Sequence, residues 1–387
     1  MELQEKFRSY FQRPAALLAR APGRVNLLGE HIDYNEGPVL PAAIDRAVHL
    51  AVAPLEEPVI SLQAVDLGSA TTFRIQDLEK RVDVSGNSLP DWAIYPAGVA
   101  WALQEAGLAL PGIQAVYSSD IPIGSGLSSS AAVEVAFAIA WQSLAGWELD
   151  RMRLAKICQR AENAYLGVQS GLMDQFACLF GVAGHALYFD TRSLAWEALP
   201  LPTGTTLVIA DSGVRRSLAA SAYNNRRQAC EQAVELLAQS LPNLTSLRDI
   251  TPTEFVAYED RLPDEVRKRA EHVVREIARV ESAASALRRD DARTFGALMF
   301  AGHASLRDLY EVSLPELDLL VQIAHDLPGC LGARLTGAGF GGCTINLVEK
   351  EAVETFMQRL QAGYREKTGG QAEIFETHAS AGASVES

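Results

Sequence analysis

GRVNLLGEHIDYN, at residues 23–35, crowds polar side chains into a short segment near the start of the chain. Its hydrogen-bonding residues are Arg24, Asn26, Glu30, His31, Asp33 and Asn35, with apolar residues between them. A half-buried strand alternates polar and apolar residues regularly, and this segment does not follow that pattern throughout. The segment raises the question of what ligand would need so many polar groups in one place.

Composition and charge restrict the class of protein. The chain has 387 residues, of which 48% are hydrophobic and 21% charged, as is typical of a globular protein with a sizeable core. Its formal charge of −14 argues against non-specific binding to nucleic acid or anionic membranes. The five cysteines are dispersed without a C-x-x-C pair, and no signal-type or membrane-spanning apolar run is present. These features predict a cytoplasmic protein with no nucleic-acid or membrane partner.

The apolar pattern predicts a mixture of strands and helices. We expect strands at residues 38–54, 59–65, 113–117, 205–211, 333–335 and 344–348. We expect helices at residues 128–144, 154–165, 219–241, 266–288 and 315–326. The second half is more helical than the first, so we place a boundary between two domains, 1–203 and 204–387.

The segment DIPIGSGLSSSAAVEVAFAIA (residues 120–140) contains a glycine- and serine-rich loop followed by a predicted helix. Gly124 and Gly126 permit close backbone approach, and the free N–H groups at the start of a helix favour an anion such as phosphate. Serine hydroxyls can also be ligands of a magnesium ion. The loop lacks the lysine of a Walker motif. The alternative is a loop that only caps a helix.

A second glycine segment, TGAGFGG (residues 336–342), formally matches the dinucleotide-binding pattern G-x-G-x-x-G. That pattern requires a helix after the glycines, whereas the residues that follow, CTINLV, alternate like a strand. We therefore exclude a nicotinamide site. The segment is either a structural turn or a turn that places its backbone beside a phosphate or another loop.

Two acidic residues stand out between residues 161 and 181. Asp174 lies in an apolar context, GLMDQFACLF, where a buried carboxylate needs a partner. It could cap a helix that begins at Gln175, or it could be a catalytic carboxylate paired with an arginine. Glu162 follows Arg160 on a predicted helix and could be an ordinary surface acid. Neither residue is decisive by itself.

Taken together, these segments resemble a known family. GRVNLLGEHIDYNEGPVLP, PIGSGLSSSAA and LTGAGFGGC are similar to the three motifs of the GHMP small-molecule kinases, and the first has the form typical of galactokinases. The AEN…GLMDQF stretch, RRSLAASAYNNRRQACEQA (residues 215–233) and SLRDLYEVSLPELDLL (residues 305–320) extend the resemblance over nearly the whole chain.

The resemblance implies a two-lobed α+β fold with mixed sheets and helices in each lobe and the active site in the cleft between them. It also implies that the end of the chain returns to the N-terminal lobe. The implied activity is the ATP- and Mg²⁺-dependent phosphorylation of the anomeric hydroxyl of D-galactose, giving α-D-galactose 1-phosphate. We expect a monomer or a weak homodimer.

The resemblance also assigns roles to individual residues. Asp174 would accept the proton of the sugar hydroxyl, and Arg24 would stabilise the charge on the transferred group. The residues expected to contact the sugar are Glu30, His31, Asp33, Gly171 and Tyr223. Those expected to bind ATP are Gly124, Ser125, Gly126, Leu127, Ser128, Ser129 and Ser130, with Trp92 against the adenine. Ser130 and Glu162 would hold Mg²⁺.

One position departs from the family pattern. Galactokinases usually carry threonine where this chain has Ile32, and the related N-acetylgalactosamine kinases tend to carry isoleucine there. The sequence therefore leaves open a kinase for N-acetylgalactosamine, galacturonate or arabinose. A sugar sensor without catalysis is a further alternative, but the intact serine loop and the presence of both Arg24 and Asp174 argue against it.

Overall fold

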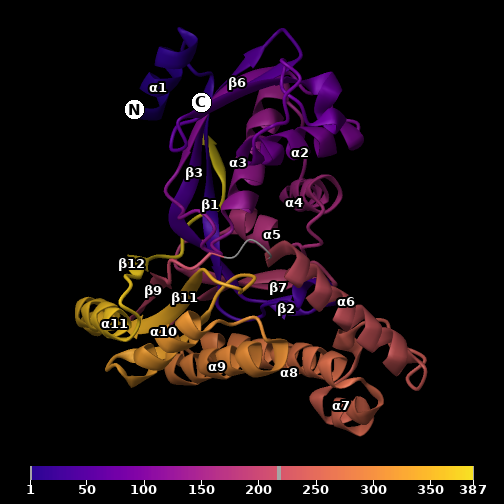
Figure 1. Cartoon of the computed structure of the whole chain (residues 1–387), viewed down its shortest axis with the longest axis vertical. Coiled ribbons are helices and arrows are strands. Elements are labelled where there is room, and N and C mark those ends of the chain that lie inside the picture. Colours follow the sequence, from indigo (N-terminus) through magenta and orange to yellow (C-terminus); the bar gives the residue numbers. More distant parts are fainter. Residues whose placement is uncertain (1, 216–218, 387) are drawn as a thin grey trace.

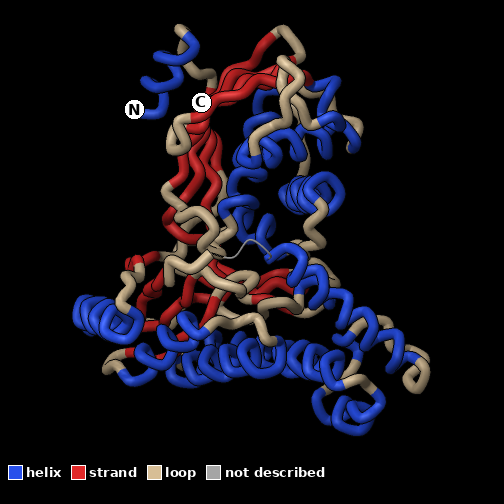
Figure 2. The backbone as a smooth tube through the Cα atoms, viewed as in Figure 1, coloured by secondary structure: helices blue, strands red, loops and turns tan. Residues whose placement is uncertain are grey.

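The computed structural model describes residues 2–215 and 219–386 (Figure 1), so residues 216–218 of the segment 215–233 lie outside the described chain. The upper part of the molecule in this view holds a large sheet with helices on both sides. The lower part holds a smaller sheet with long helices beneath it (Figure 2). Within the described residues, no helix has both the length and the apolar character needed to cross a membrane.

The upper sheet has six strands in the order β13-β1-β3-β6-β4-β5. They are β1 (Leu17–Asn26), β3 (Pro41–Leu55), β4 (Val59–Ala64), β5 (Ser69–Arg74), β6 (Gly112–Ser119) and β13 (Ser384–Glu386). All neighbours are antiparallel except β4 and β6. The long alternating runs predicted at residues 38–54, 59–65 and 113–117 are confirmed as strands.

Helices cover both faces of this sheet. α1 (Glu2–Phe11) buries Phe7 against Ala51 and Val116 on one face. The other face is covered by α3 (Ser129–Ala145) and α5 (Met173–Phe180), with α2 (Asp91–Glu105) and α4 (Arg151–Arg160) packed against α3. α3 is the alanine-rich helix that the sequence predicts, and its small side chains let it pack closely on β1 and β3.

The lower sheet is antiparallel, in the order β10-β11-β9-β12. Its strands are β9 (Thr205–Asp211), β10 (Cys330–Leu335), β11 (Cys343–Glu349) and β12 (Glu373–Thr377). The long helices of this part are α8 (Asp264–Arg288), α9 (Ala292–Ser305), α10 (Pro315–Asp326) and α11 (Val353–Thr368). The proline that opens α10 stands at the first helical position, as predicted.

A third sheet joins the two parts. It consists of β2 (Pro38–Val39), β7 (His185–Asp190) and β8 (Trp196–Pro200), and it packs against α8. The remaining helices are α6 (Ala219–Ala238) and α7 (Pro252–Tyr258). At the end of the chain, β13 pairs with β1. The boundary between residues 203 and 204 stays a prediction.

One alternative and one local prediction were wrong. Asp174 does not cap a helix beginning at Gln175, because α5 begins at Met173 and places Asp174 inside its first turn. The helix predicted at residues 154–165 is two elements, since α4 ends at Arg160 and a π-helical turn follows over Ala161–Leu166. Apolar spacing does not distinguish these winding patterns, because the difference is less than one residue per turn. All five cysteines are free.

Candidate active site

A cavity of about 760 Å³ opens where the motifs of the sequence meet. Its lining includes β1 and the loop after it, α2, the loop before α3, the π-helical turn at Ala161–Leu166 with the segment from it to the start of α5, α6, and the glycine turn between β10 and β11. The predicted residues that line it are Arg24, Glu30, His31, Asp33, Trp92, Gly124, Gly126, Ser128, Ser129, Ser130, Glu162, Gly171, Asp174 and Tyr223. Ser125 and Leu127 are buried within the same loop instead.

Arg24 and Asp174 form a bidentate ion pair in this cavity. Nε of Arg24 donates to Oδ1 of Asp174 at 2.8 Å, and Nη2 donates to Oδ2 at 2.7 Å. Burial alone would lower the pKa of Arg24, but the Asp174 carboxylate more than offsets this effect and raises it. Nη1 donates to the carbonyl oxygen of Gly126 at 2.7 Å. Arg24 therefore fixes the acid and connects it to the glycine-serine loop.

Ser128 adds a further donor to Asp174, through a hydrogen bond from its Oγ to Oδ2. Asp174 also lies in the first turn of α5, where the helix dipole favours a negative charge. These contacts hold the Asp174 side chain in place. They also orient it rigidly relative to the start of α3.

The glycine segment at residues 336–342 supports the phosphate loop, which we define as residues 122–128. A Cβ atom on Gly337 would lie 2.5 Å from the carbonyl oxygen of Gly126, and one on Gly342 would lie 2.5 Å from that of Ser125. Only glycine permits such close contact between two backbones. The glycine turn therefore packs against another loop. The strand predicted after it is confirmed as β11, which is not the context of a dinucleotide site.

Glu162 is part of a buried polar cluster, so the alternative of an ordinary surface acid is wrong. Its Oε2 accepts hydrogen bonds from Oγ of Ser170 at 2.5 Å and from Nε2 of Gln175 at 3.0 Å. Burial raises the pKa of Glu162 above its usual value. Nε2 of Gln175 also donates to Glu134, which stands one helical turn after Ser130 on α3. Gln175 therefore links Glu162 to α3, the helix that carries Ser130.

Glu30 is almost completely buried and is held by an arginine that the sequence analysis did not single out. Nη2 of Arg334 donates to Oε2 of Glu30, and the N–H of Gly337 donates to Oε1 at 3.3 Å. Arg334 has no exposed surface and also donates to Glu276 on α8 at 3.0 Å. Burial raises the pKa of Glu30, and the charge of Arg334 opposes that shift.

His31 is neutral and takes part in a chain of hydrogen bonds. Its Nε2 lies 3.0 Å from the carbonyl oxygen of Ala338, and its Nδ1 lies 2.8 Å from the hydroxyl of Tyr34. The carbonyl can only accept, so Nε2 carries the proton and Nδ1 accepts from Tyr34. The Tyr34 hydroxyl in turn lies 2.7 Å from that of Tyr310. Burial lowers the pKa of His31 to about 3.

Asp33 lies beside Gly171 at the edge of the cavity. A Cβ atom on Gly171 would be only 2.0 Å from Oδ2 of Asp33, so a larger residue could not occupy this position. The N–H of Tyr34 donates to Oδ1 of Asp33 at 3.0 Å. Burial raises the pKa of Asp33 to about 6, and the nearby charge of Asp174 adds to that shift.

Two aromatic residues stand in different regions of the cavity wall. The ring of Tyr223 lies 5.1 Å from that of His31 and 5.4 Å from that of Tyr34, between centroids, so it belongs to the sugar-motif side. Trp92, in the first turn of α2, donates from Nε1 to Oγ of Ser69 at 3.3 Å. Its ring lies 5.9 Å from that of Tyr117, far along the chain from the sugar motif.

Comparison with known proteins identifies the family. Residues 5–54 match the model of the galactokinase galactose-binding signature, and residues 95–182 and 283–366 match the N-terminal and C-terminal domain models of the GHMP kinases. The chain is 46% identical to a galactokinase from Roseiflexus sp. (strain RS-1), over 98% of this chain and 96% of that protein. It is 44% identical to a galactokinase from Chloroflexus aggregans, over 94% and 92% of the two chains. The chain belongs to the galactokinase family.

The structure agrees with that assignment. The crystal structure of the galactokinase from Lactococcus lactis in complex with galactose superimposes with a TM-score of 0.93, at 34% sequence identity and over 98% of both chains. The two-lobed α+β architecture expected from the motifs is thereby confirmed.

Ile32 is the position at which this chain departs from the usual pattern of the galactokinase family. Its side chain is fully buried, and Gly37 packs directly against it. Among the described residues that line the cavity, Ile32 does not appear. The side chain therefore belongs to the core beneath the sugar motif and does not face a ligand.

Sequence reasoning missed two residues that hold the galactokinase motifs together. Arg334 fixes Glu30, and Tyr310 closes the hydrogen-bond chain from His31. Arg334 left a signal, because it is a lone charge in the otherwise apolar strand CLGARL and such a residue needs a buried partner. Tyr310 left no such signal, because a tyrosine is common in helices that face a core.

Proposed function

We propose that this chain transfers the γ-phosphoryl group of ATP to the anomeric hydroxyl of D-galactose, giving α-D-galactose 1-phosphate and ADP. Membership of the galactokinase family supports the ATP-dependent phosphorylation of galactose. The residue roles rest on one observation: Arg24 bonds both to the carboxylate of Asp174 and to the backbone of the phosphate loop at Gly126.

In this mechanism, Asp174 hydrogen-bonds the anomeric hydroxyl and accepts its proton as that oxygen attacks the γ-phosphorus. The new O–P bond forms while the bond between the γ-phosphorus and the leaving oxygen of ADP breaks. The guanidinium of Arg24 neutralises charge on the transferred group and orients Asp174. Positioning and charge neutralisation account for most of the catalysis of phosphoryl transfer.

The sugar would be recognised by Glu30, Asp33, the backbone at Gly171 and Tyr223. Both ring nitrogens of His31 are engaged by Ala338 and Tyr34, so a sugar contact through this ring requires one of those bonds to exchange. Buried acceptors discriminate well between sugars, because a sugar that lacks a hydroxyl leaves its partner unpaired.

The nucleotide would lie between the phosphate loop and Trp92, with phosphates at the start of α3. Ser130 and Glu162 offer the hydroxyl and carboxylate oxygens that Mg²⁺ prefers, and both line the cavity. The donor set therefore fits a magnesium ion, which would supply positive charge to the phosphate oxygens. We also propose that the protein is a monomer or weak homodimer. We propose a cytoplasmic location, which the five free cysteines support.

The test is turnover with magnesium-ATP across a panel of sugars, with the product identified by phosphorus NMR. The panel contains galactose, 2-deoxygalactose, N-acetylgalactosamine, glucose, arabinose and galacturonate. We expect phosphate on the anomeric oxygen of galactose and the highest kcat/KM for that sugar. A preference for another sugar would overturn the substrate assignment. ATP binding without any product would overturn the catalytic one.

A further inference from the structure

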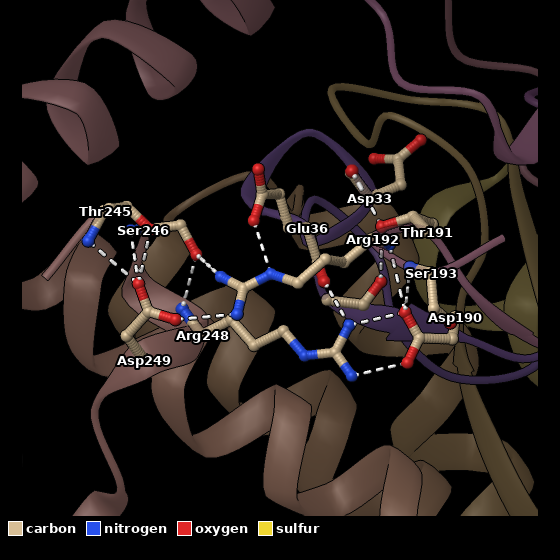
Figure 3. A network of polar contacts seen from close by, with 11 residues as sticks. Asp33, Glu36, Asp190, Thr191, Arg192, Ser193, Thr245, Ser246, Arg248 and Asp249 are labelled. Atoms are coloured by element: carbon tan, nitrogen blue, oxygen red, sulfur yellow. Dashed lines mark hydrogen bonds and ion pairs between the residues drawn. The ribbon is translucent and has the colours of Figure 1, made fainter.

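Part of the sugar motif is held by two turns that lie far from it in the sequence (Figure 3). We call residues 29–37 the sugar loop and residues 190–193, which follow β7, the support turn. The second turn, residues 245–249, comes from the lower half of the chain. None of these supporting groups has a role in the proposed reaction.

Thr191 of the support turn touches the sugar loop directly. Its hydroxyl lies 3.2 Å from the carbonyl oxygen of Asp33 and 3.0 Å from that of Gly37. The hydroxyl has a single hydrogen, which the two carbonyls share. Thr191 thereby holds the main chain at Asp33, at one end of the 33–37 segment, and at Gly37, at the other.

Arg248 holds the middle of this segment. Its Nη1 donates to the carbonyl oxygen of Glu36 at 2.7 Å, and both of its Nη atoms donate to the Asp190 carboxylate at 2.6 Å. Although partial burial would raise the pKa of Asp190, the hydrogen bonds from Arg248 lower it to about 2, so the pair is ionised at neutral pH. Asp190 is also the strand partner of Pro38, which fixes the exit of the sugar loop.

Arg192 links the sugar loop to the turn at residues 245–249. Its Nε donates to Oε2 of Glu36 at 2.6 Å, and its Nη1 lies 2.7 Å from Oδ1 of Asp249. Nη2 donates to Oγ of Ser246 at 2.8 Å. Thr191 and Arg192 thus bond to the sugar loop directly, and Asp190 restrains it through Arg248, as Figure 3 shows.

The position of this backbone matters because the side chain of Asp33 has little room to adjust. Gly171 approaches so closely that an added Cβ would lie 2.0 Å from Oδ2 of Asp33. A small shift of the main chain at Asp33 would therefore move its carboxylate by a similar amount. Hydrogen bonds weaken steeply when distance and angle depart from their optimum.

We propose that the support turn and Arg248 are positioning residues for galactose, which act by fixing the backbone of Asp33. The inference rests on the proposed function, in which Asp33 accepts hydrogen bonds from the sugar. It assigns part of the enzyme's sugar affinity to residues that do not touch the sugar. The nucleotide end of the cavity shares none of these bonds, so its affinity is unaffected.

The decisive variant is Thr191→Val, which keeps the shape of the side chain and removes only its hydroxyl. We expect the KM for galactose to rise by about 3- to 10-fold, the effect of losing one or two weak hydrogen bonds. The kcat and the KM for ATP stay at their wild-type values. Thr191→Ser keeps the hydroxyl and restores the wild-type KM. Arg248→Met, which removes charged bonds, gives a larger rise of about 10-fold or more.

Arg288→Met is the matched control, because it breaks an ion pair between Arg288 and Glu197 on the neighbouring strand β8. It leaves the KM for galactose unchanged, and thermal unfolding of every variant separates folding from binding. A loss of kcat without a change in the KM for galactose would mean that Thr191 and Arg248 only stabilise the fold, which overturns the inference.

Asp33→Asn separates the inference from the proposed function. If this variant raises the KM for galactose while Thr191→Val and Arg248→Met do not, the sugar contact holds and the positioning role is overturned. If Asp33→Asn leaves the KM unchanged, the assigned sugar contact and the positioning role both fail.

Discussion

The sugar loop and the phosphate loop line the same cavity but are stabilised in different ways. In the sugar loop, Glu30, His31 and Glu36 each bond to a side chain or carbonyl from another part of the chain. The phosphate loop is rich in glycine, and its tip carries Ile123 with 67% of its surface exposed. Its outside contacts are mainly to its backbone, such as the hydrogen bond from Arg215 to the carbonyl of Ile123 at 2.9 Å.

The difference follows from the ligands that the two loops would bind. A neutral sugar offers only hydroxyl groups, so its protein partners must be fixed in advance to give affinity and selectivity. A triphosphate brings its own charge and is attracted by backbone N–H groups and a helix N-terminus. Rigid side-chain networks are therefore needed at one end of the cavity, and close backbone packing suffices at the other.

The largest expected effect on turnover is at Asp174, which lies in the cavity that both loops line. Asp174→Asn removes the proton acceptor and lowers kcat by about 10² to 10⁴, the usual range for a general base. Because the amide keeps the size of the side chain, the Kd for galactose changes little. Steady-state kinetics and calorimetry measure the two effects. Turnover close to wild type would show that Asp174 does not accept the proton.

The phosphate end is tested by Gly342→Ala, with Gly146→Ala as its control. Both glycines have positive φ, 84° and 73°, so each variant loses about 1–2 kcal/mol of folding free energy. Of the two added Cβ atoms, the one at residue 342 would lie 2.5 Å from the carbonyl oxygen of Ser125 in the phosphate loop, whereas the one at residue 146 would have no atom within 4 Å. We expect Gly342→Ala to raise the KM for ATP by about 10-fold. Equal KM values for ATP in the two variants would show that the contact between Gly342 and Ser125 does not support nucleotide binding.

The sugar end is tested by pH, through Asp33. Its pKa of about 6 means that the carboxylate, which in the proposed function accepts sugar hydrogen bonds, is lost as the pH falls through that value. The Kd for galactose should rise about 4-fold between about pH 7.5 and about pH 5.5. Stability responds with the opposite sign: because folding raises this pKa, the contribution of Asp33 to stability falls as the pH rises from about 4 to about 6. A Kd profile as flat as that of Asp33→Asn would reject this assignment.

The smallest effect on binding concerns Ile32. Its side chain is buried beneath the sugar loop, so Ile32→Thr should leave the ratio of kcat/KM for galactose and N-acetylgalactosamine unchanged. The buried hydroxyl lowers the free energy of unfolding by about 1–3 kcal/mol, measured by urea denaturation. A changed sugar ratio would mean that the core under the sugar loop also sets specificity.

Much of this enzyme could be predicted from its sequence. The segment at residues 23–35, the serine loop and TGAGFGG identify the family because each combines residue types that local chemistry makes unusual. Strands such as Thr205–Asp211 and helices such as Pro315–Asp326 follow from apolar periodicity, which depends only on neighbouring residues. The start of α5 and the π-helical turn at Ala161–Leu166 were missed, because tertiary packing decides such shifts of one or two residues.

The sequence by itself determined the family, the chemistry and the candidate residues, since those depend on short motifs. Only the tertiary structure decided which distant groups hold them: Arg334 on Glu30, Gly342 against Ser125, and Thr191 on the carbonyl of Asp33. The two hydrogen bonds join residues that are 304 and 158 positions apart in the sequence. The third contact is a close approach of two backbones. No local pattern encodes them, because a side chain's partner across the fold is set by how the sheets and helices pack.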